Sequence, residues 1–151
     1  MSIVTGPITP DGALIDVLVG VSNSRKRLLE RGGFPVPNKI PVRAIIDTGS
    51  FATAFLPRVF KSLDLKPLGP IKVRTPSTKR GEPHITDQFD VSVTLVSGME
   101  EVIELRIHAI VSDDFDDWKD APQAIIGRDV LSRCAFSYYG HAGEWTLAFS
   151  K

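Results

Sequence analysis

The chain has 151 residues, of which 42% are hydrophobic and 24% are charged, so we expect one globular domain with an apolar core. The 18 basic and 18 acidic side chains balance to a formal net charge of zero, which excludes a general attraction to nucleic acid or an anionic membrane. The single cysteine, Cys134, excludes a disulfide within the chain and a thiolate zinc cluster.

The N-terminal stretch "MSIVTGPITPDG" has neither a basic n-region nor an apolar h-region, so no signal peptide is expected. No uncharged apolar run approaches the ~20 residues needed to cross a bilayer. A lone cysteine also fits a reducing compartment. We therefore predict a cytoplasmic protein with no membrane partner.

Two apolar runs of strand length come first, Ala13–Val21 and Ile40–Ile46, and the second leads directly into Asp47. The connector between them is polar and carries a basic cluster at Arg25, Lys26 and Arg27. This cluster fits either a patch for nucleic acid or an acidic partner, or a solvated connector. The neutral chain favours the connector, so we predict no nucleic-acid partner.

A helix is predicted from Pro57 because proline is favoured at the first helical position. Beyond it, "ITDQFDVSVTL" alternates apolar and polar residues, as a half-buried antiparallel strand does. The turn residues Ser97 and Gly98 and a second alternating run at 102–111 complete a β-hairpin. The apolar face of its first strand consists of Ile85, Phe89, Val91, Val93 and Leu95.

Five aspartates between Asp113 and Asp120 lack the spacing of a calcium loop, and we interpret them as an exposed acidic loop. A short helix is predicted over 128–134, and a second hairpin over 135–149 that turns at Gly140 to Gly143. These elements predict a single domain over 1–151 that is all-β, a compact closed barrel with one or two short helices.

The segment "VRAIIDTGSFATAFLP" ends a buried strand on a carboxylate, Asp47, which costs free energy unless it is compensated. Thr48, Gly49 and Ser50 follow at once. Glycine allows a tight turn and close backbone approach, so backbone N–H groups of such a loop can hold an aspartate oxygen at the floor of a cleft.

The hydrophobic-hydrophobic-Asp-Thr-Gly-Ser pattern resembles the active-site loop of aspartic proteases. A second segment, "QAIIGRDVL", resembles the late Gly-Arg-Asp/Asn segment of the retropepsin-like family. The resemblance extends from about Ala13 to Phe149, and its specific part is these two motifs in the family's order. It implies a single-domain retropepsin-like closed barrel with a flap hairpin.

By this resemblance Asp47 is the catalytic residue, supported by Thr48, Gly49 and Ser50. Ile125, Ile126 and Gly127 form the strand beside the catalytic loop, and Arg128 and Asp129 begin a helix. The implied activity is that of an aspartic endopeptidase, which uses no metal or cofactor and acts on protein or peptide substrates.

The chain has one Asp-Thr-Gly, whereas the family's chemistry needs two aspartates. The resemblance therefore implies a homodimer with Asp47 facing its counterpart, and with Thr48 bonded across the two-fold axis. The chain ends, residues 1–5 and 145–151, are the candidates for a shared dimer sheet.

The implied flap lies within residues 75–86, and Phe51 and Ala52 are implied subsite residues at positions where relatives often carry acids that contact the peptide backbone. The flap residues expected to touch substrate are Ser77, Thr78, Lys79, Arg80, Gly81 and Glu82. This flap is more polar than those of viral relatives. A catalytically silent module that dimerises or binds an extended peptide is therefore the alternative, although the intact Asp-Thr-Gly favours the enzyme.

Overall fold

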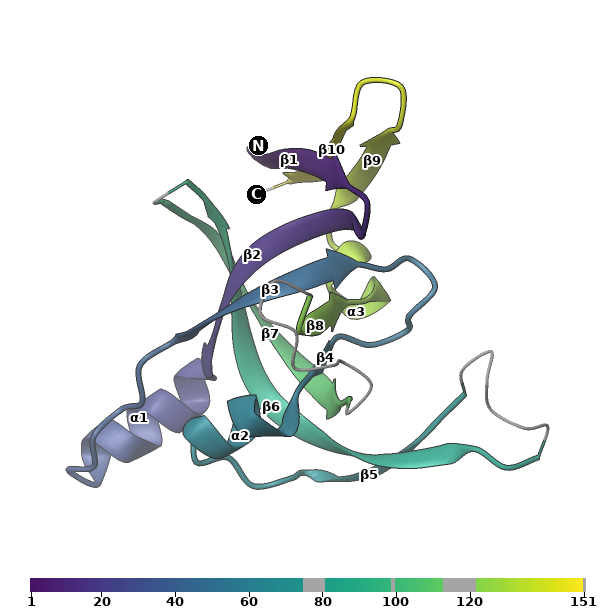
Figure 1. Cartoon of the computed structure of the whole chain (residues 1–151). Helices are drawn as coiled ribbons and strands as arrows, with labels where there is room; N and C mark the ends of the chain where they lie inside the picture. Colours follow the sequence, from purple (N-terminus) through teal and green to yellow (C-terminus); the bar gives the residue numbers. More distant parts are fainter. Residues whose placement is uncertain (75–80, 99, 113–121, 151) are drawn as a thin grey trace.

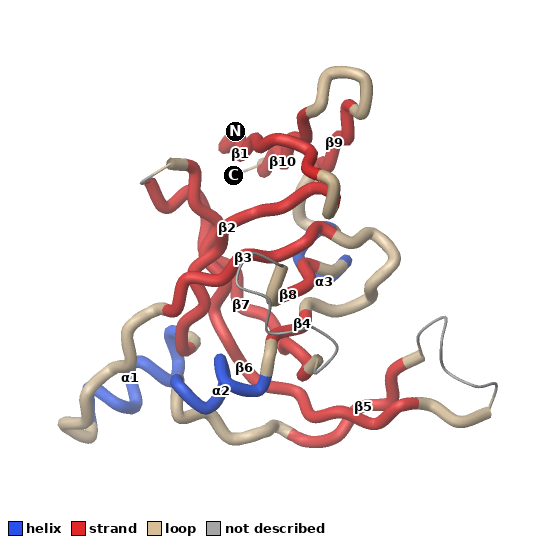
Figure 2. Tube along the Cα trace, in the orientation of Figure 1, coloured by secondary structure: helices blue, strands red, loops and turns tan. Residues whose placement is uncertain are grey.

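A computed structural model describes residues 1–74, 81–98, 100–112 and 122–150, and strands dominate it (Figures 1 and 2). The strands of the described residues are β1 Ser2–Thr9, β2 Gly12–Val21, β3 Ile40–Ile46, β4 Ala54–Phe55, β5 Gly69–Val73, β6 His84–Ser97, β7 Glu100–Val111, β8 Ala124–Ile126, β9 Ala135–Tyr139 and β10 Glu144–Phe149. The helices are α1 Asn23–Arg31, α2 Pro57–Ser62 and α3 Arg128–Leu131. None of them is both long and apolar enough to cross a membrane, within the residues described.

Six strands close into a barrel in the order β2, β3, β8, β4, β7 and β6, and the pairing of β6 with β2 completes the ring. Two pairs are parallel, β3 with β8 and β4 with β7, and the other pairs of the ring are antiparallel. The prediction of an all-β closed barrel with few, short helices is confirmed.

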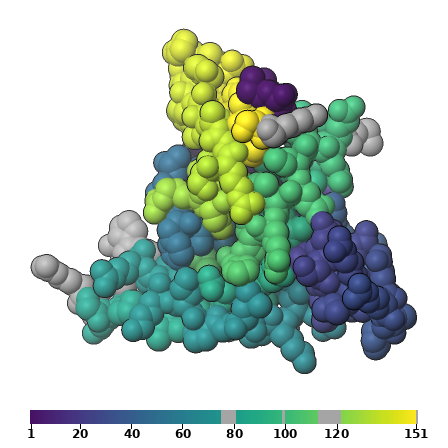
Figure 3. Space-filling model, turned by 180° about the vertical axis from the view of Figure 1, so that it is seen from behind, coloured from purple at the N-terminus to yellow at the C-terminus, as the bar shows by residue number. Residues whose placement is uncertain are grey.

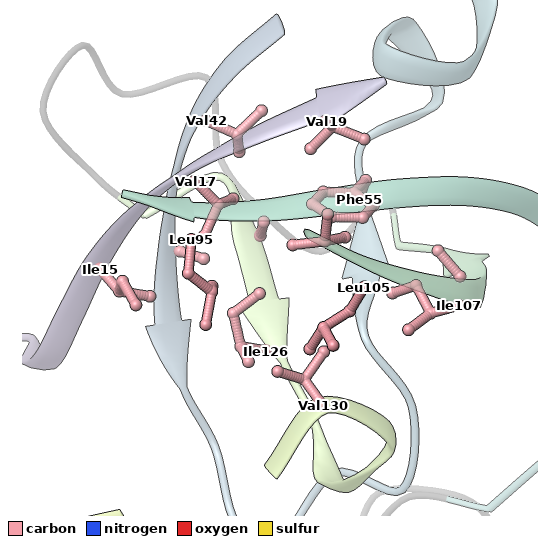
Figure 4. Packing of buried hydrophobic residues seen from close by; sticks show 14 of the residues in the cluster. Ile15, Val17, Val19, Val42, Phe55, Leu95, Leu105, Ile107, Ile126 and Val130 are labelled. Atoms are coloured by element: carbon pink, nitrogen blue, oxygen red, sulfur yellow. The ribbon is translucent and has the colours of Figure 1, made fainter. Parts of the chain in front are cut away.

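The barrel interior is filled by alternate residues of its strands (Figure 4). On β2, Ile15, Val17 and Val19 point inward, as the two-residue period of a strand requires. They belong to the same buried cluster as Leu95 of β6 and Ile126 of β8. Burying each such side chain contributes roughly 1.5–3 kcal/mol, so this packing fixes the strands that carry the candidate site.

Helix α1 is an element that the sequence analysis does not predict, since the segment was interpreted as a solvated connector. Ser22 caps it, with its Oγ accepting the N–H of Arg25 at 3.3 Å. No side chain of α1 is buried. The segment therefore lacks the periodic apolar pattern that predicts a helix. The serine cap and the Gly32–Gly33 pair after the helix are nevertheless ordinary helix signals.

The hairpin of β6 and β7 is present as predicted, with departures on both faces of β6. Ile85, expected on the apolar face, is 61% exposed because this part of the strand extends beyond the barrel. Ser92 and Thr94, expected on the polar face, are buried, and the Thr94 hydroxyl accepts a hydrogen bond from Nζ of Lys39 at 3.1 Å. Ser92 compensates by donating its hydroxyl to the carbonyl of Val21 at 3.1 Å.

The three strands β1, β10 and β9 form a terminal sheet, which lies at one end of the molecule, with the α1 segment at the other (Figure 3). The hairpin of β9 and β10 is the one predicted over 135–149. The two chain ends pair with each other, Ser2 opposite Phe149. Trp145 is buried under Gly6, where a Cβ atom would lie 2.5 Å from the indole ring.

Candidate active site

Asp47 lies at the first position after β3, where β3 and β8 end side by side. Ile46 pairs with Ile126, and the N–H of Asp47 then donates to the carbonyl of Ile126 at 3.0 Å. Both strands are short and apolar, so their ends are fixed by the barrel core. The backbone of Asp47 is thereby held rigidly, while its side chain remains partly exposed.

The turn that follows Asp47 provides hydrogen-bond donors that compensate the cost of partly burying its carboxylate. The N–H of Gly49 donates to Oδ1 of Asp47 at 2.8 Å, and the N–H of Ser50 donates to the Asp47 carbonyl at 3.3 Å. A Cβ atom on Gly49 would lie 3.1 Å from that same Oδ1, which is tighter than ordinary packing. The second oxygen, Oδ2, accepts no hydrogen bond from the described residues.

Arg128 joins the second motif to the candidate catalytic loop, residues 47–50. Its Nη1 donates to the carbonyls of Thr48 and Gly49, each at 3.0 Å, and its backbone N–H donates to the carbonyl of Ser50 at 2.9 Å. The Ser50 hydroxyl turns inward and donates to the carbonyl of Ala52 at 2.7 Å. Residues 80 positions apart in the chain thus form one braced loop.

Beside the loop, Asp129 and Thr53 form a partly buried polar network. The Thr53 hydroxyl donates to Oδ1 of Asp129 at 2.7 Å and accepts the N–H of Gly127 at 3.1 Å. The N–H of Thr53 donates to Oδ2 of Asp129 at 2.9 Å. Thr53 is fully buried, and the sequence analysis missed it because nothing in its local pattern distinguishes it from other strand threonines.

The two predicted subsite residues lie in different surroundings. Phe51 is 37% exposed and lies at the surface beside the loop. Ala52 is 4% exposed and packs in a small cluster with Ala54, Val73 and Ile110. Ala52 is thus buried in packing that includes Val73 of β5, and its assignment as a subsite residue stays a prediction.

The predicted flap falls only partly within the structure. Ser77, Thr78, Lys79 and Arg80 lie outside the described residues, as does the acidic loop at 113–120. Gly81 and Glu82 are exposed, and Gly81 has φ +88°, which glycine adopts readily. They lie between β5 and β6, just before β6 begins, and these two strands form an arm that extends beyond the barrel (Figure 1).

An open groove of about 570 Å³ lies between this arm and the candidate catalytic loop. Gly49 and Phe51 line it from the loop and Arg128 from α3. From the arm it is lined by Lys72, Arg74, Gly81 and Pro83. Sequence analysis missed Lys72 and Arg74, although their spacing in "IKVRT" places both on one side of a strand.

The described residues contain no group of three or more histidine, cysteine or acidic side chains suited to hold a metal ion. The polar groups that do converge on the loop are one carboxylate, the backbone donors that fix it, and the guanidinium of Arg128. This arrangement can orient a carboxylate toward solvent for proton transfer, and one chain supplies one such carboxylate.

No family model matches the sequence, and no curated protein matches it. Among solved structures, the chain is similar to a crystal structure of a retropepsin-like aspartic protease from Rickettsia conorii, with a TM-score of 0.57 and 14% sequence identity. The match covers 98% of this chain and 91% of that chain. At this identity the likeness establishes the fold, so the barrel described above is a retropepsin-like fold.

Proposed function

We propose that this chain is an aspartic endopeptidase that acts as a homodimer. The observation that carries the proposal is the Asp47 carboxylate, held by the Gly49 N–H at the end of two parallel strands and braced by Arg128, on a retropepsin-like fold. A carboxylate that is partly exposed and held in a fixed orientation at the end of a buried strand can act as a general acid or base.

The dimer follows from the number of aspartates required. One Asp-Thr-Gly loop provides half of a two-carboxylate centre, and a two-fold axis beside Asp47 brings in the other half. Thr48 is exposed and is the residue proposed to bond across that axis. The outer face of the terminal sheet, which carries Ile3, Thr5, Thr146 and Ala148 in register, is uncharged there and suits contact with a second copy.

In the proposed mechanism, two close carboxylates share one proton because ionising both is costly, as in the well-known aspartic-protease dyad. The ionised Asp47 accepts a proton from water, and the protonated one donates to the carbonyl oxygen of the peptide bond. Water attacks the carbonyl carbon and a tetrahedral diol forms. The nitrogen then accepts a proton, the C–N bond breaks and the amine leaves. These steps require no metal, cofactor or acyl-enzyme.

The test compares wild type with Asp47→Asn on a diverse peptide mixture between about pH 4 and 7, a range that covers common dyad titrations, with cuts identified by mass spectrometry. We expect cleavage by wild type and none by Asp47→Asn, which should still fold. Asp11→Asn, at the exposed β1–β2 turn, is the matched control and should cleave as wild type does. Equal cleavage by Asp47→Asn would refute the proposal.

A silent peptide-binding or dimerisation module is the second candidate, favoured by Phe51 and Ala52 where acidic residues would contact a peptide backbone. The transition-state mimic pepstatin separates the two in the same experiment. Protection from thermal unfolding that is lost in Asp47→Asn favours the enzyme. Peptide binding that is equal in both proteins, without any cleavage, favours the module.

A further inference from the structure

Three cations line the groove beside the catalytic loop, and we name it the cationic groove after Lys72, Arg74 and Arg128. Lys72 lies on the edge strand β5, and Arg74 directly follows the last residue of that strand. Because the two residues are two positions apart, their side chains leave the same side of the backbone. Val73, between them, is buried in the small apolar cluster with Ala52, Ala54 and Ile110. This packing fixes the strand that presents both cations to the groove.

These positive charges are not neutralised by the described part of the chain. Neither Lys72, Arg74 nor Arg128 has a carboxylate within 4.0 Å among the described residues. Among the described residues, Lys39, Arg43 and Arg106 do form such ion pairs with carboxylates. The chain as a whole has zero formal charge, so the groove is a local concentration of positive charge.

The other described residues that line the groove are uncharged. They are two glycines, a proline and a phenylalanine: Gly49, Gly81, Pro83 and Phe51. Glu82 lies between two of them in sequence but does not line the groove. Arg128 uses Nη1 to hold the catalytic loop, and a guanidinium has further N–H donors that a ligand carboxylate can accept from.

We propose that the cationic groove selects peptides with acidic side chains next to the bond that is cleaved; this inference rests on the proposed function. The groove begins at Gly49, two positions after Asp47, so an extended peptide lying across Asp47 continues into it. Alternate side chains of an extended peptide point to one side, and acidic residues at alternate positions meet the cations. Such attraction favours acidic peptides and weakens with salt.

Binding is tested first, with Asp47→Asn so that the peptide is not cut. The probes are a fluorescent decapeptide with Phe-Leu at its centre and glutamates at alternate flanking positions, and the same peptide with glutamine in place of glutamate. Fluorescence anisotropy should show the glutamate peptide binding about tenfold tighter at low salt, with the ratio shrinking as salt is raised. Equal affinities at low salt would overturn the inference.

Variants locate the effect in the groove. Lys72→Glu with Arg74→Glu should remove or invert the preference for the glutamate peptide. Lys26→Glu with Arg27→Glu makes the same change in net charge on exposed α1 and should keep the preference. A preference that the groove variant keeps, or that the α1 variant loses equally, would contradict a role of the groove.

Cleavage by wild type separates this inference from the proposed function. Cuts that depend on Asp47 and are enriched in Asp or Glu within a few residues support both. Cuts that depend on Asp47 without such enrichment, together with equal peptide affinities, overturn the inference and leave the endopeptidase intact. No cuts, with the glutamate preference retained by wild type and lost in the groove variant, overturn the endopeptidase and leave acidic-peptide selection intact.

Discussion

At the scale of single residues, Gly127 shows why the second motif requires glycine. Its φ of −98° is open to any residue, so backbone conformation is not the reason. A Cβ atom there would lie 2.5 Å from the carbonyl carbon and oxygen of Ala52. The contact is with backbone, which cannot rotate away. Glycine is needed because Gly127, directly after β8, lies against the backbone of Ala52 beside the candidate catalytic loop.

Gly127→Ala should therefore lower the free energy of unfolding by about 2–3 kcal/mol, the upper part of the range for overpacking. The matched control is Gly140→Ala, where the nearest atom to a new Cβ lies 3.5 Å away and φ is not positive. That change should stay within about 0.5 kcal/mol. Urea unfolding of both variants measures the difference, and equal stabilities would contradict the close approach.

At the scale of elements, α1 is attached to the barrel through its cap and not through apolar packing. The Ser22 hydroxyl donates to Oδ2 of Asp90 on β6 at 2.7 Å, and Arg106 on β7 donates to both oxygens of Asp90 at 2.7 and 3.1 Å. Burial raises the pKa of Asp90, but the hydrogen bonds from Arg106 and Ser22 and the charge of Arg106 outweigh it, so the net pKa is lowered.

A pKa that is lower in the folded chain gives stability that is present above the unfolded value, about 3.9 for aspartate. This stability is lost as the pH falls through the lower folded pKa. Asp90→Asn should therefore be less stable than wild type at pH 6, and the gap should narrow below about pH 4. Thermal unfolding from pH 6 to 3 measures it, with Asp16→Asn in the exposed pair with Arg43 as control. A stability difference between wild type and Asp90→Asn that does not change with pH would contradict a stabilising role of the ionised Asp90 carboxylate.

The elements differ in how well their own sequence predicts them. The strands β3, β6 and β7 were predictable because their apolar residues repeat along a buried face. Helix α1 buries none of its side chains, so its formation leaves no hydrophobic pattern. The exposure of Ile85 depends on where β6 leaves the barrel, and Thr94 is buried where Lys39, distant in the chain, contacts it, so neither follows from the sequence of the strand alone.

At the scale of the whole molecule, the motifs named the residues of the site but not their contacts. Asp129 was predicted at a helix start and lies in the first turn of α3, but its carboxylate also accepts hydrogen bonds from Thr53, 76 positions earlier, which the motif did not indicate. Likewise the groove is lined by residues from the arm that contains edge strand β5 and by residues from the candidate catalytic loop. Lys72 and Arg74 lie beside that loop only because the arm is folded. Such contacts depend on barrel closure, which short sequence patterns do not encode.

The proposed dimer makes a sharp prediction about mixed subunits, because each reaction centre needs Asp47 from two chains. Wild type and Asp47→Asn, refolded together in equal amounts, form wild-type, mixed and variant dimers, and only the first has both carboxylates. Activity per total protein should fall to about one quarter of the wild-type value. Wild type mixed with Asp11→Asn, also in equal amounts, should lose nothing. Retention of about one half would mean that each chain works alone, which removes the reason for a shared centre.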